Sequence, residues 1–295
     1  MATVSCGGTS ERYRFIKKLE SVVGVKYLCA SLGVSRSGYY DWRKRQPSDR
    51  SLCDAAFKQV IQTIYDESNG TYGSPRVYQA LKKQGYTIGR KRVERLMRDM
   101  VVVGRVVKVT RRTPGLKRFL FSGENLRHGN RGPSKINQVW VADITYLKVN
   151  KRWMYPSVIM DLYSRRIIGW SLDKIRTAEV TKRTLEYAIK KRAPEKELIF
   201  HTDRGVEYRG SVFQDALKKH SFKHSLNRIG HCIDNGHMES FFHSMKGELI
   251  RGRSYKSEDD LRYDLKKYIS YFYNQKRLHS GIGYCSPLEY EALAA

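Results

Sequence analysis

The sequence lacks the marks of a secreted or membrane protein. Its 5 cysteines are odd in number, widely spaced and never arranged as C-x-x-C, which favours reduced thiols in a cytosolic protein. No apolar run approaches the roughly 18 residues of a membrane span, and the start MATVSCGGTSERYR has no apolar signal segment. A G-x-x-x-x-G-K-[ST] loop is also missing, which argues against ATP hydrolysis. We therefore expect a cytoplasmic protein without a membrane partner.

Acidic residues are scarce. The chain has 56 Lys and Arg against 29 Asp and Glu, a net charge of +27. Residues 1–136 hold 28 basic and 10 acidic residues, and residues 137–295 hold 28 and 19. A basic front half indicates a polyanionic partner such as DNA, because neutralising phosphates releases counterions. A charge that serves only solubility is the alternative.

The front of the chain reads as helices. In residues 1–47, Leu28 and Leu32 would face inward, Gly33 allows a turn and Ser35 can cap a second helix. This pattern predicts a helix-turn-helix that displays Arg36, although a plain helical hairpin would look the same. Residues 48–103 predict one longer helix and then two shorter ones, separated between Gly85 and Gly89.

The last of these helices has two distinct faces. Its apolar stripe and its basic face each repeat at helical spacing, as in a helix that lies on DNA or merely has a solvated basic face. The stripe comprises Val93, Leu96, Met97 and Met100, and the basic face comprises Lys91, Arg95 and Arg98. Residues 104–136 follow with nine basic residues, one acid, two prolines and five glycines. We interpret them as a basic linker that is ordered only on DNA.

From Gln138 the pattern becomes rich in β-strands. Three strands over 139–149, 152–164 and 167–173 are followed by alternating helices and strands, which predicts a mixed α/β sheet in residues 137–295. Thr177 should cap a helix over 177–192. The later elements are a strand over 197–203, a helix over 211–219, a strand over 222–226, a helix from about Asp234, and a final helix through Tyr273 with a capping box of Ser257 and Asp260.

Three carboxylates stand out in this half. Asp143 lies within an apolar strand, Asp203 ends another, and Glu239 lies early in a helix. A charge buried in a strand is costly without a cation, and strand ends are where α/β folds bind ligands. Convergent carboxylates suit Mg²⁺ or Mn²⁺, and paired ions serve phosphoryl transfer. Each aspartate could instead form a salt bridge or a helix cap, and Asp234 is a candidate cap for the Glu239 helix.

Histidines crowd one stretch of the second half. A zinc site is an alternative use for them, but their spacings match no common zinc finger. The stretch holds His220, His224, His231, Cys232 and His237.

Six motifs make the sequence recognisable as a whole. VWVADITYLKV, HTDRGVEYRG, IDNGHMESFFHSMKGE and YNQKRLHSGIGYCSPLEYE resemble the OrfB transposases of copy-out–paste-in bacterial insertion sequences. LGVSRSGYYDWRKR and YGSPRVYQALKKQGYTIGRKRVERLM resemble the same family, so that the resemblance spans residues 12–292. The 35 residues from Arg204 to Met238 also match the DD(35)E signature of transposases and retroviral integrases.

The resemblance implies an RNase-H-like, retroviral-integrase-type core in which Asp143, Asp203 and Glu239 are the catalytic metal ligands. Two Mg²⁺ ions per site, replaceable by Mn²⁺, would support cleavage at the element ends and direct attack by the freed 3′-hydroxyl. The implied partners are terminal inverted repeats, target DNA, further copies of the chain and an OrfA-type partner or fusion, in the nucleoid of a bacterium. We assign DNA contacts to Arg36, Arg76, Lys91, Arg95, Arg98 and Lys246, and the rim of the active site to His201, Asn235 and His243.

The sequence departs from this family at several points. Gly236 stands where the family usually has Ala, and Glu207 where it often has Gln. No leucine heptads are present, so the chain resembles the OrfB part alone. Two rival functions are a nuclease of the same fold that hydrolyses without joining ends, and a DNA-binding regulator without chemistry.

Overall fold

The computed structural model describes residues 8–105, 123–129 and 132–294. The chain forms two compact units, residues 1–60 and 61–295, and the division falls within the long helix α4, Asp49–Glu67. Much of the predicted linker over 104–136 lies outside the described residues, so its ordering on DNA stays a prediction. The proposed domain boundaries at residues 47, 103 and 136 also stay predictions.

The first unit is a small helical bundle. It contains α1 (Thr9–Leu19), α2 (Val25–Ser31) and α3 (Arg36–Lys44), which close on a core of Ile16, Leu28, Cys29 and Tyr39. Gly33 has a φ of 63°, a left-handed conformation that suits glycine. The Ser35 hydroxyl accepts a hydrogen bond from the Gly38 amide at 3.0 Å. The helix, turn and capped helix predicted here are therefore present.

The second unit begins with the C-terminal part of α4, followed by α5 (Ser74–Lys83) and α6 (Arg90–Asp99). Gly85 follows α5 with a φ of 84° and separates the two helices as predicted. The apolar stripe of α6 is confirmed, because Val93, Leu96 and Met97 are buried.

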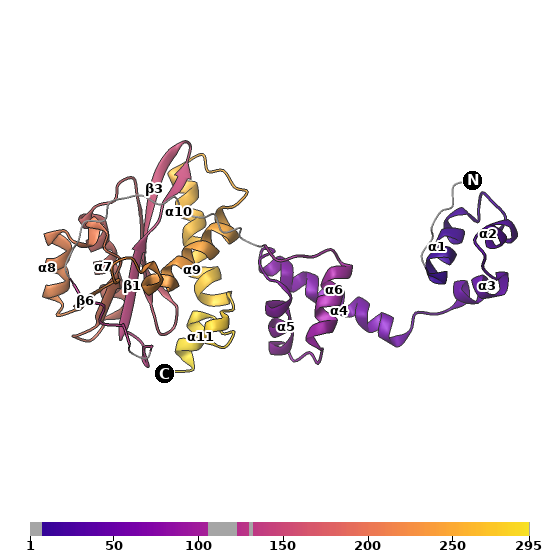
Figure 1. Ribbon diagram of the computed structural model, residues 1–295, viewed down its shortest axis with the longest axis horizontal. Coiled ribbons are helices and arrows are strands. Elements are labelled where there is room, and N and C mark those ends of the chain that lie inside the picture. The colour runs from indigo at the N-terminus through magenta and orange to yellow at the C-terminus, as the bar shows by residue number, and fades with distance from the viewer. Residues whose placement is uncertain (1–7, 106–122, 130–131, 295) are drawn as a thin grey trace. The chain divides into compact units, whose positions relative to one another are not determined.

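A six-stranded sheet forms the centre of the second unit (Figure 1). Its pairing order is β2–β3–β1–β5–β6, and β4 also pairs with β3. β1, β2 and β4 run antiparallel to β3, while β5 is parallel to both β1 and β6. The strands are β1 (Val139–Ile144), β2 (Leu147–Val149), β3 (Arg152–Asp161), β4 (Ile167–Asp173), β5 (Ile199–Thr202) and β6 (Lys223–Leu226).

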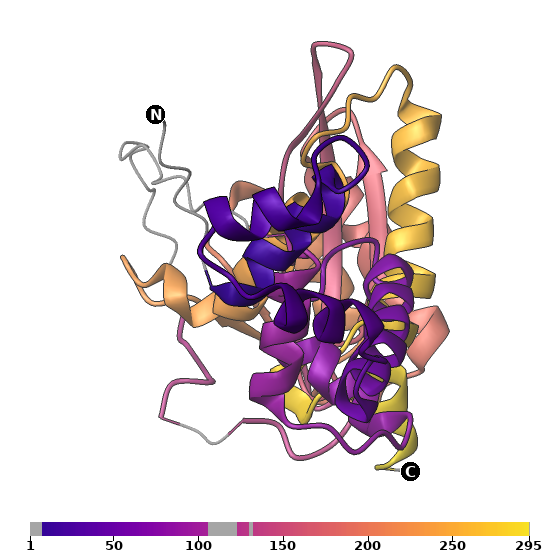
Figure 2. The ribbon, with the colours of Figure 1, turned by 90° about the vertical axis from the view of Figure 1, so that its right-hand side faces the viewer.

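Helices cover both faces of this sheet. On one face, α7 (Ala178–Arg192) and α8 (Ser211–Lys219) pack on a cluster that includes Trp140, Ala142 and Phe200. Side chains alternate across a strand, so Val141 and Asp143 point to the opposite face. α9 (Gly236–Met245) contacts β1. A long helical segment also runs beside β3 and β4 (Figures 1 and 2). It is formed by α10 (Glu258–Lys266) and η4 (Lys267–Lys276).

Several details differ from the sequence predictions. The strand predicted over 139–149 is interrupted at residues 145–146, although β1 and β2 pair with β3 in one continuous register. The final helical segment continues to Lys276, and a further helix, α11 (Pro287–Ala292), follows it. Ser257 caps α10 through the Asp260 amide at 3.1 Å, but the reciprocal capping box is found at Ser286 and Glu289. Short-range signals therefore marked the helix starts better than the ends.

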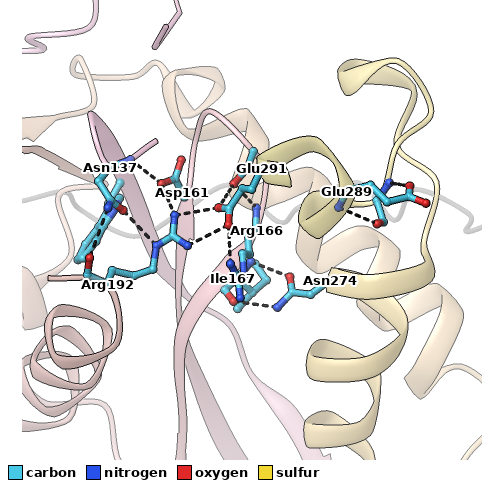
Figure 3. Close-up of polar contacts among 11 residues, drawn as sticks. Asn137, Asp161, Arg166, Ile167, Arg192, Asn274, Glu289 and Glu291 are labelled. Atoms are coloured by element: carbon cyan, nitrogen blue, oxygen red, sulfur yellow. Dashed lines mark hydrogen bonds and ion pairs between the residues drawn. The ribbon is translucent and has the colours of Figure 1, made fainter. Parts of the chain in front are cut away.

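A buried ionic network fastens α11 to the sheet (Figure 3). Arg192 donates to both carboxylate oxygens of Glu291, at 2.9 and 2.8 Å, and lies 3.4 Å from Asp161. Glu291 also accepts hydrogen bonds from Arg166 and from the Ser164 hydroxyl. These charges are largely withdrawn from water, so each depends on its partners.

Candidate active site

Asp143 lies near the C-terminal end of β1, on the face opposite the α7 and α8 cluster. It is half-buried and stands opposite Val158 of β3. Its Oδ1 accepts a hydrogen bond from the Ile144 amide at 2.8 Å. The side chain is thus held at a strand end by its own backbone.

Asp203 directly follows β5 and comes beside Asp143. The parallel register joins Val139 to Ile199 and Val141 to His201, so Asp143 and Asp203 each lie two residues beyond the last pair of these two strands, at the same end of the sheet. Asp203 Oδ1 accepts a hydrogen bond from the Gly205 amide at 2.9 Å. The structure therefore brings two of the three predicted carboxylates to one edge of the sheet.

The turn after Asp203 places a tyrosine among these charges. Tyr208 ends the short helix η1 (Val206–Tyr208), and its hydroxyl is buried with no hydrogen-bond partner among the described residues. Burial, followed by the negative charges of Asp143, Glu207 and Asp203, raises the pKa of Tyr208 well above its usual range. The phenol therefore stays protonated and can donate a hydrogen bond next to both aspartates.

Glu207 is a fourth carboxylate in this neighbourhood, and it is buried. Its Oε2 lies 3.4 Å from Arg176 Nε, which is an ion-pair distance without hydrogen-bond geometry. Burial raises the pKa of Glu207, and the charge of Asp203 adds to this, while Arg176 opposes it. A Cβ atom at Gly205 would come within 2.5 Å of Glu207 Oε1, so this glycine lets the carboxylate pack onto the Asp203 turn.

Glu239 lies in the first turn of α9 and is half-buried. One turn earlier, Asn235 donates from its side-chain amide to the Ala142 carbonyl at 3.0 Å, which anchors the start of α9 beside Asp143. Across the described parts of the chain, however, no three His, Cys, Asp or Glu side chains are close enough to share a metal ion. The register thus brings Asp143 and Asp203 to one end of the sheet, and the place of Glu239 in a shared metal site stays a prediction.

The other predicted residues at the rim have different surroundings. His201 is fully buried, and its ring nitrogens bond to Ser225 Oγ and Asn227 Oδ1, both at 2.8 Å. Its assignment to the rim is therefore corrected: it joins β5 to β6 inside the core. Asn235 is buried in the anchor described above, and His243 is exposed on α9.

Two alternative readings of this stretch are not supported. Asp234 does not cap α9, because its carboxylate binds Arg228 at 2.9 Å and the Asn125 amide at 2.8 Å. His224 is held by Thr202 and Gln214, each at 3.0 Å. The described side chains of the histidine-rich stretch form no zinc site.

The basic residues assigned to DNA contacts have three kinds of surroundings. Arg36, Lys91 and Arg98 are exposed, whereas Arg95 pairs with Asp99 at 3.1 Å on α6. Two others lie against aromatic rings, Lys246 Nζ at 4.6 Å from the ring centre of Tyr146 and Arg76 at 5.7 Å from that of Tyr72. Sequence reasoning missed Tyr208 and the anchoring role of Asn235, since neither has a distinctive local pattern.

Three models of known protein domains match this chain. Models of the integrase core domain match residues 133–232 and 239–293, and a model of an HTH-like domain matches residues 53–109. This last match covers α4, α5 and α6 rather than the helical hairpin of the first unit.

Similar proteins match along nearly the whole chain. The Transposase InsF for insertion sequence IS3A of Escherichia coli (strain K12) is 35% identical over 286 residues, which cover 95% of this chain and 98% of that protein. The insertion element IS600 uncharacterized 31 kDa protein of Shigella sonnei is 34% identical over 260 residues, 88% of this chain and 96% of that protein.

Solved structures give more distant matches. The HTLV-2 integrase catalytic core domain in complex with magnesium has a TM-score of 0.41 and 19% identity, and the match covers 52% of this chain and 96% of that one. The catalytic domain of Mos1 mariner transposase has a TM-score of 0.38 and 14% identity, over 46% of this chain and 71% of that one.

A mixed sheet with an integrase core and an HTH-like domain defines a transposase of the integrase type. The chain belongs to the family of transposases encoded by IS3-type insertion sequences. No helix in the described parts of the chain is long and apolar enough to cross a bilayer.

Proposed function

We propose that Asp143, Asp203 and Glu239 form the catalytic centre with which this transposase cuts the ends of its element and joins them to target DNA. The observation that carries the proposal is the register of β1 and β5, because Asp143 and Asp203 each follow the last paired residues of these strands by two positions. The anchor from Asn235 to Ala142 adds support, because it fixes the helix that bears Glu239 at the same end of β1.

The donor set suits a divalent cation with a preference for oxygen. Adjacent carboxylates repel one another unless a cation lies between them, and hard oxygen ligands select Mg²⁺ or Mn²⁺ over zinc. Asp143 and Asp203 would hold such ions, with Glu239 completing the set. Two bound ions would stabilise the attacking and leaving oxygens of phosphoryl transfer.

The surrounding residues would keep this centre rigid. The amides of Ile144 and Gly205 fix one oxygen of each aspartate, and Tyr208 offers a buried hydroxyl on which both carboxylates act electrostatically. Glu207 and Arg176 hold the turn that carries Asp203. Such supports matter because small displacements of reacting groups are costly in rate.

The substrate we propose is the terminal inverted repeat, followed by target DNA. The exposed basic residues Arg36, Lys91 and Arg98 would contact phosphates and set the position of the duplex, and Lys246 would contact DNA near the carboxylates. Several copies of the chain would work together on two element ends, with an OrfA-type partner or fusion supplying part of the end recognition.

A strand-transfer assay tests this function. The protein is incubated with a labelled end of the element, a target plasmid and Mg²⁺, with and without the OrfA part, and products longer than the substrate are scored. We expect joined products from the wild type and from Asp215→Asn, a matched change at an exposed carboxylate on α8. Asp143→Asn and Asp203→Asn should give none. Cleavage without joining would instead identify a nuclease.

A further inference from the structure

The motif YNQKRLHSG, which the proposed catalytic centre does not use, lines a second site. A pocket of about 310 Å³ lies between α9, η4 and the residues that follow η4. Met160, whose neighbour Ile159 packs in the α7 and α8 cluster, lines it, so the pocket opens on the opposite face of the sheet. Its polar lining consists of Arg76, Arg165, His237, Ser240, Ser244, Tyr273, Arg277, His279 and Ser280, with no carboxylate.

Arg277 organises this lining. It is buried and forms two-pronged contacts with Glu248, including one of 2.8 Å from Nη2 to Oε1, so its charge is compensated. Its Nη2 also donates to Ser244 Oγ at 3.0 Å, and its Nη1 lies 3.3 Å from His279 Nδ1. Because Ser244 Oγ accepts this bond, its own O–H remains available as a donor.

The same contact fixes the proton of His279. A guanidinium can only donate, so His279 Nδ1 accepts and the neutral ring carries its proton on Nε2. That Nε2 is buried and has no hydrogen-bond partner among the described residues. Burial, followed by the charges of Arg277 and Arg76, lowers the pKa of His279 to about 2, which keeps the ring neutral at neutral pH. A buried donor without an acceptor is costly, and an anion in the pocket would supply the acceptor.

Two further guanidiniums supply uncompensated positive charge. Within the described residues, neither Arg76 nor Arg165 forms an ion pair with a carboxylate. Arg76 Nε donates to the Leu278 carbonyl at 3.1 Å, which holds the side chain in place. Arg165 has a φ of 63°, an unfavourable conformation for a residue with a side chain. Such strain is concentrated at functional sites.

We propose that this pocket binds one phosphate of the DNA backbone, held by Arg76, Arg165 and the Nε2–H of His279. The proposal deepens the proposed function and rests on it for the identity of the anion. Three of its lining residues, His237, Ser240 and Ser244, lie on α9, and Ser240 directly follows Glu239. A DNA strand whose phosphate sits here would therefore pass beside the carboxylates. This pocket would fix the strand's register along α9.

A phosphate scan on DNA tests the proposal. Binding of end DNA is measured by anisotropy with Asp143→Asn protein, which keeps strand cutting out of the assay. Single backbone phosphates of each strand are replaced in turn by neutral methylphosphonates. In protein that retains Arg165, we expect a methylphosphonate at one position, or at two adjacent ones, to weaken DNA binding. At the same position, protein with Arg165→Gln should lose no further affinity for DNA. Arg183→Gln makes an equal charge change at an exposed arginine that pairs with Asp173. In this control variant, the methylphosphonate at the same position should lower DNA affinity as much as it does in protein without the change.

Additional variants and a thermal-unfolding measurement distinguish a DNA phosphate from a free anion. Arg165→Lys keeps the charge and should restore most of the positional effect, and Arg76→Gln should reproduce the loss if Arg165→Gln misfolds. Thermal unfolding in inorganic phosphate against chloride at equal ionic strength measures the pocket without DNA. If phosphate stabilises the protein but every methylphosphonate position lowers DNA affinity equally, the pocket binds a free anion and the DNA assignment is overturned. Absence of both effects would overturn the site. Neither readout requires strand transfer, so a failed joining assay leaves them interpretable.

Discussion

The side-chain amide of Asn235 donates a 3.0 Å hydrogen bond to the backbone carbonyl of Ala142, the residue before Asp143. The bond joins the start of α9 to the strand end that bears the first carboxylate. Both groups are buried, so the bond cannot be exchanged for one to water. The position of Glu239 relative to β1 therefore depends on it.

Asn235→Ala should lower the free energy of unfolding by about 1–3 kcal/mol, because it leaves a buried carbonyl without its donor. Strand transfer should fall further than this loss of stability explains, since the start of α9 is no longer fixed. Urea unfolding and the joining assay measure the two effects. Gln275→Ala removes an exposed amide-to-carbonyl bond of 3.0 Å and should change neither. Equal strand transfer by both variants would show that the anchor is dispensable.

Divalent cations should stabilise the wild-type protein against heat. A ligand that binds only the folded state raises the melting temperature as its concentration increases. Mg²⁺ or Mn²⁺ should therefore raise it in the wild type and in Asp215→Asn, but not in Asp143→Asn or Asp203→Asn. Asp143→Asn and Asp203→Asn should bind end DNA as well as the wild type or better, because each removes a negative charge near the DNA phosphates. An undiminished cation effect in Asp143→Asn would remove Asp143 from the ligand set.

Tyr208→Phe should leave the protein as stable as the wild type or raise its stability by about 1 kcal/mol, since the deleted hydroxyl is buried and has no hydrogen-bond partner in the described parts of the chain. If the hydroxyl supports the carboxylates during catalysis, strand transfer should nevertheless decrease. Chemical unfolding and single-turnover joining distinguish the two. A clear loss of stability would mean that the hydroxyl is hydrogen-bonded in solution.

His224 should make stability sensitive to acid. Burial lowers the pKa of His224 to about 4. Gln214 donates to its Nδ1, and Thr202 donates to the Asp203 carbonyl and accepts from Nε2. Protonation would break the Gln214 bond. Because the folded pKa lies below the unfolded value near 6.5, the stabilisation is present above pH 6.5. It should then be lost as the pH falls toward 4, by about 1.4 kcal/mol per pH unit.

Urea unfolding between pH 7 and pH 5 measures this slope. His224→Gln removes the titrating group and should flatten the slope by about one proton. His220→Gln serves as the control, because the side-chain contact found for His220 among the described residues is with the ring of Phe222. A slope that His224→Gln leaves unchanged would show that other groups cause the acid sensitivity.

Much of the fold was predictable because its signals are local. The β4 strand, the α8 helix and the helices on either side of Gly85 follow from apolar periodicity and turn residues. Placement in two apolar strands and early in a helix singled out Asp143, Asp203 and Glu239, and the motif resemblance then implied that they are metal ligands. The register that brings Asp143 and Asp203 to the same end of the sheet depends on strand pairing between residues 60 apart in sequence, which no local pattern records.

The burial of individual polar groups was harder to predict. His201 was assigned to the rim, but its ring is held inside the core by Ser225 of β6 and by Asn227, which follows β6. Asp234 has the position and chemistry of a helix cap, yet Arg228 and Asn125 compete for its carboxylate more effectively. The phosphate pocket combines residues from α5, β3, α9 and the segment after η4, so only the tertiary structure could assemble it.

The fastening of α11 by Glu291 has a genetic consequence. Glu291 follows Asp143, Asp203 and Glu239 in the sequence and forms ion pairs with Arg192 and Arg166. A nonsense or frameshift lesion just before the Glu291 codon would spare the three carboxylates of the catalytic centre. It would nevertheless remove the carboxylate that pairs with Arg166 and leave Arg192 with Asp161 alone. Breaking a buried pair in this way costs about 3–5 kcal/mol, a large part of the stability of a typical domain. Copies of the element with such lesions should therefore be inactive although their carboxylates are intact, and counting intact DDE codons would overestimate the number of mobile copies in a genome.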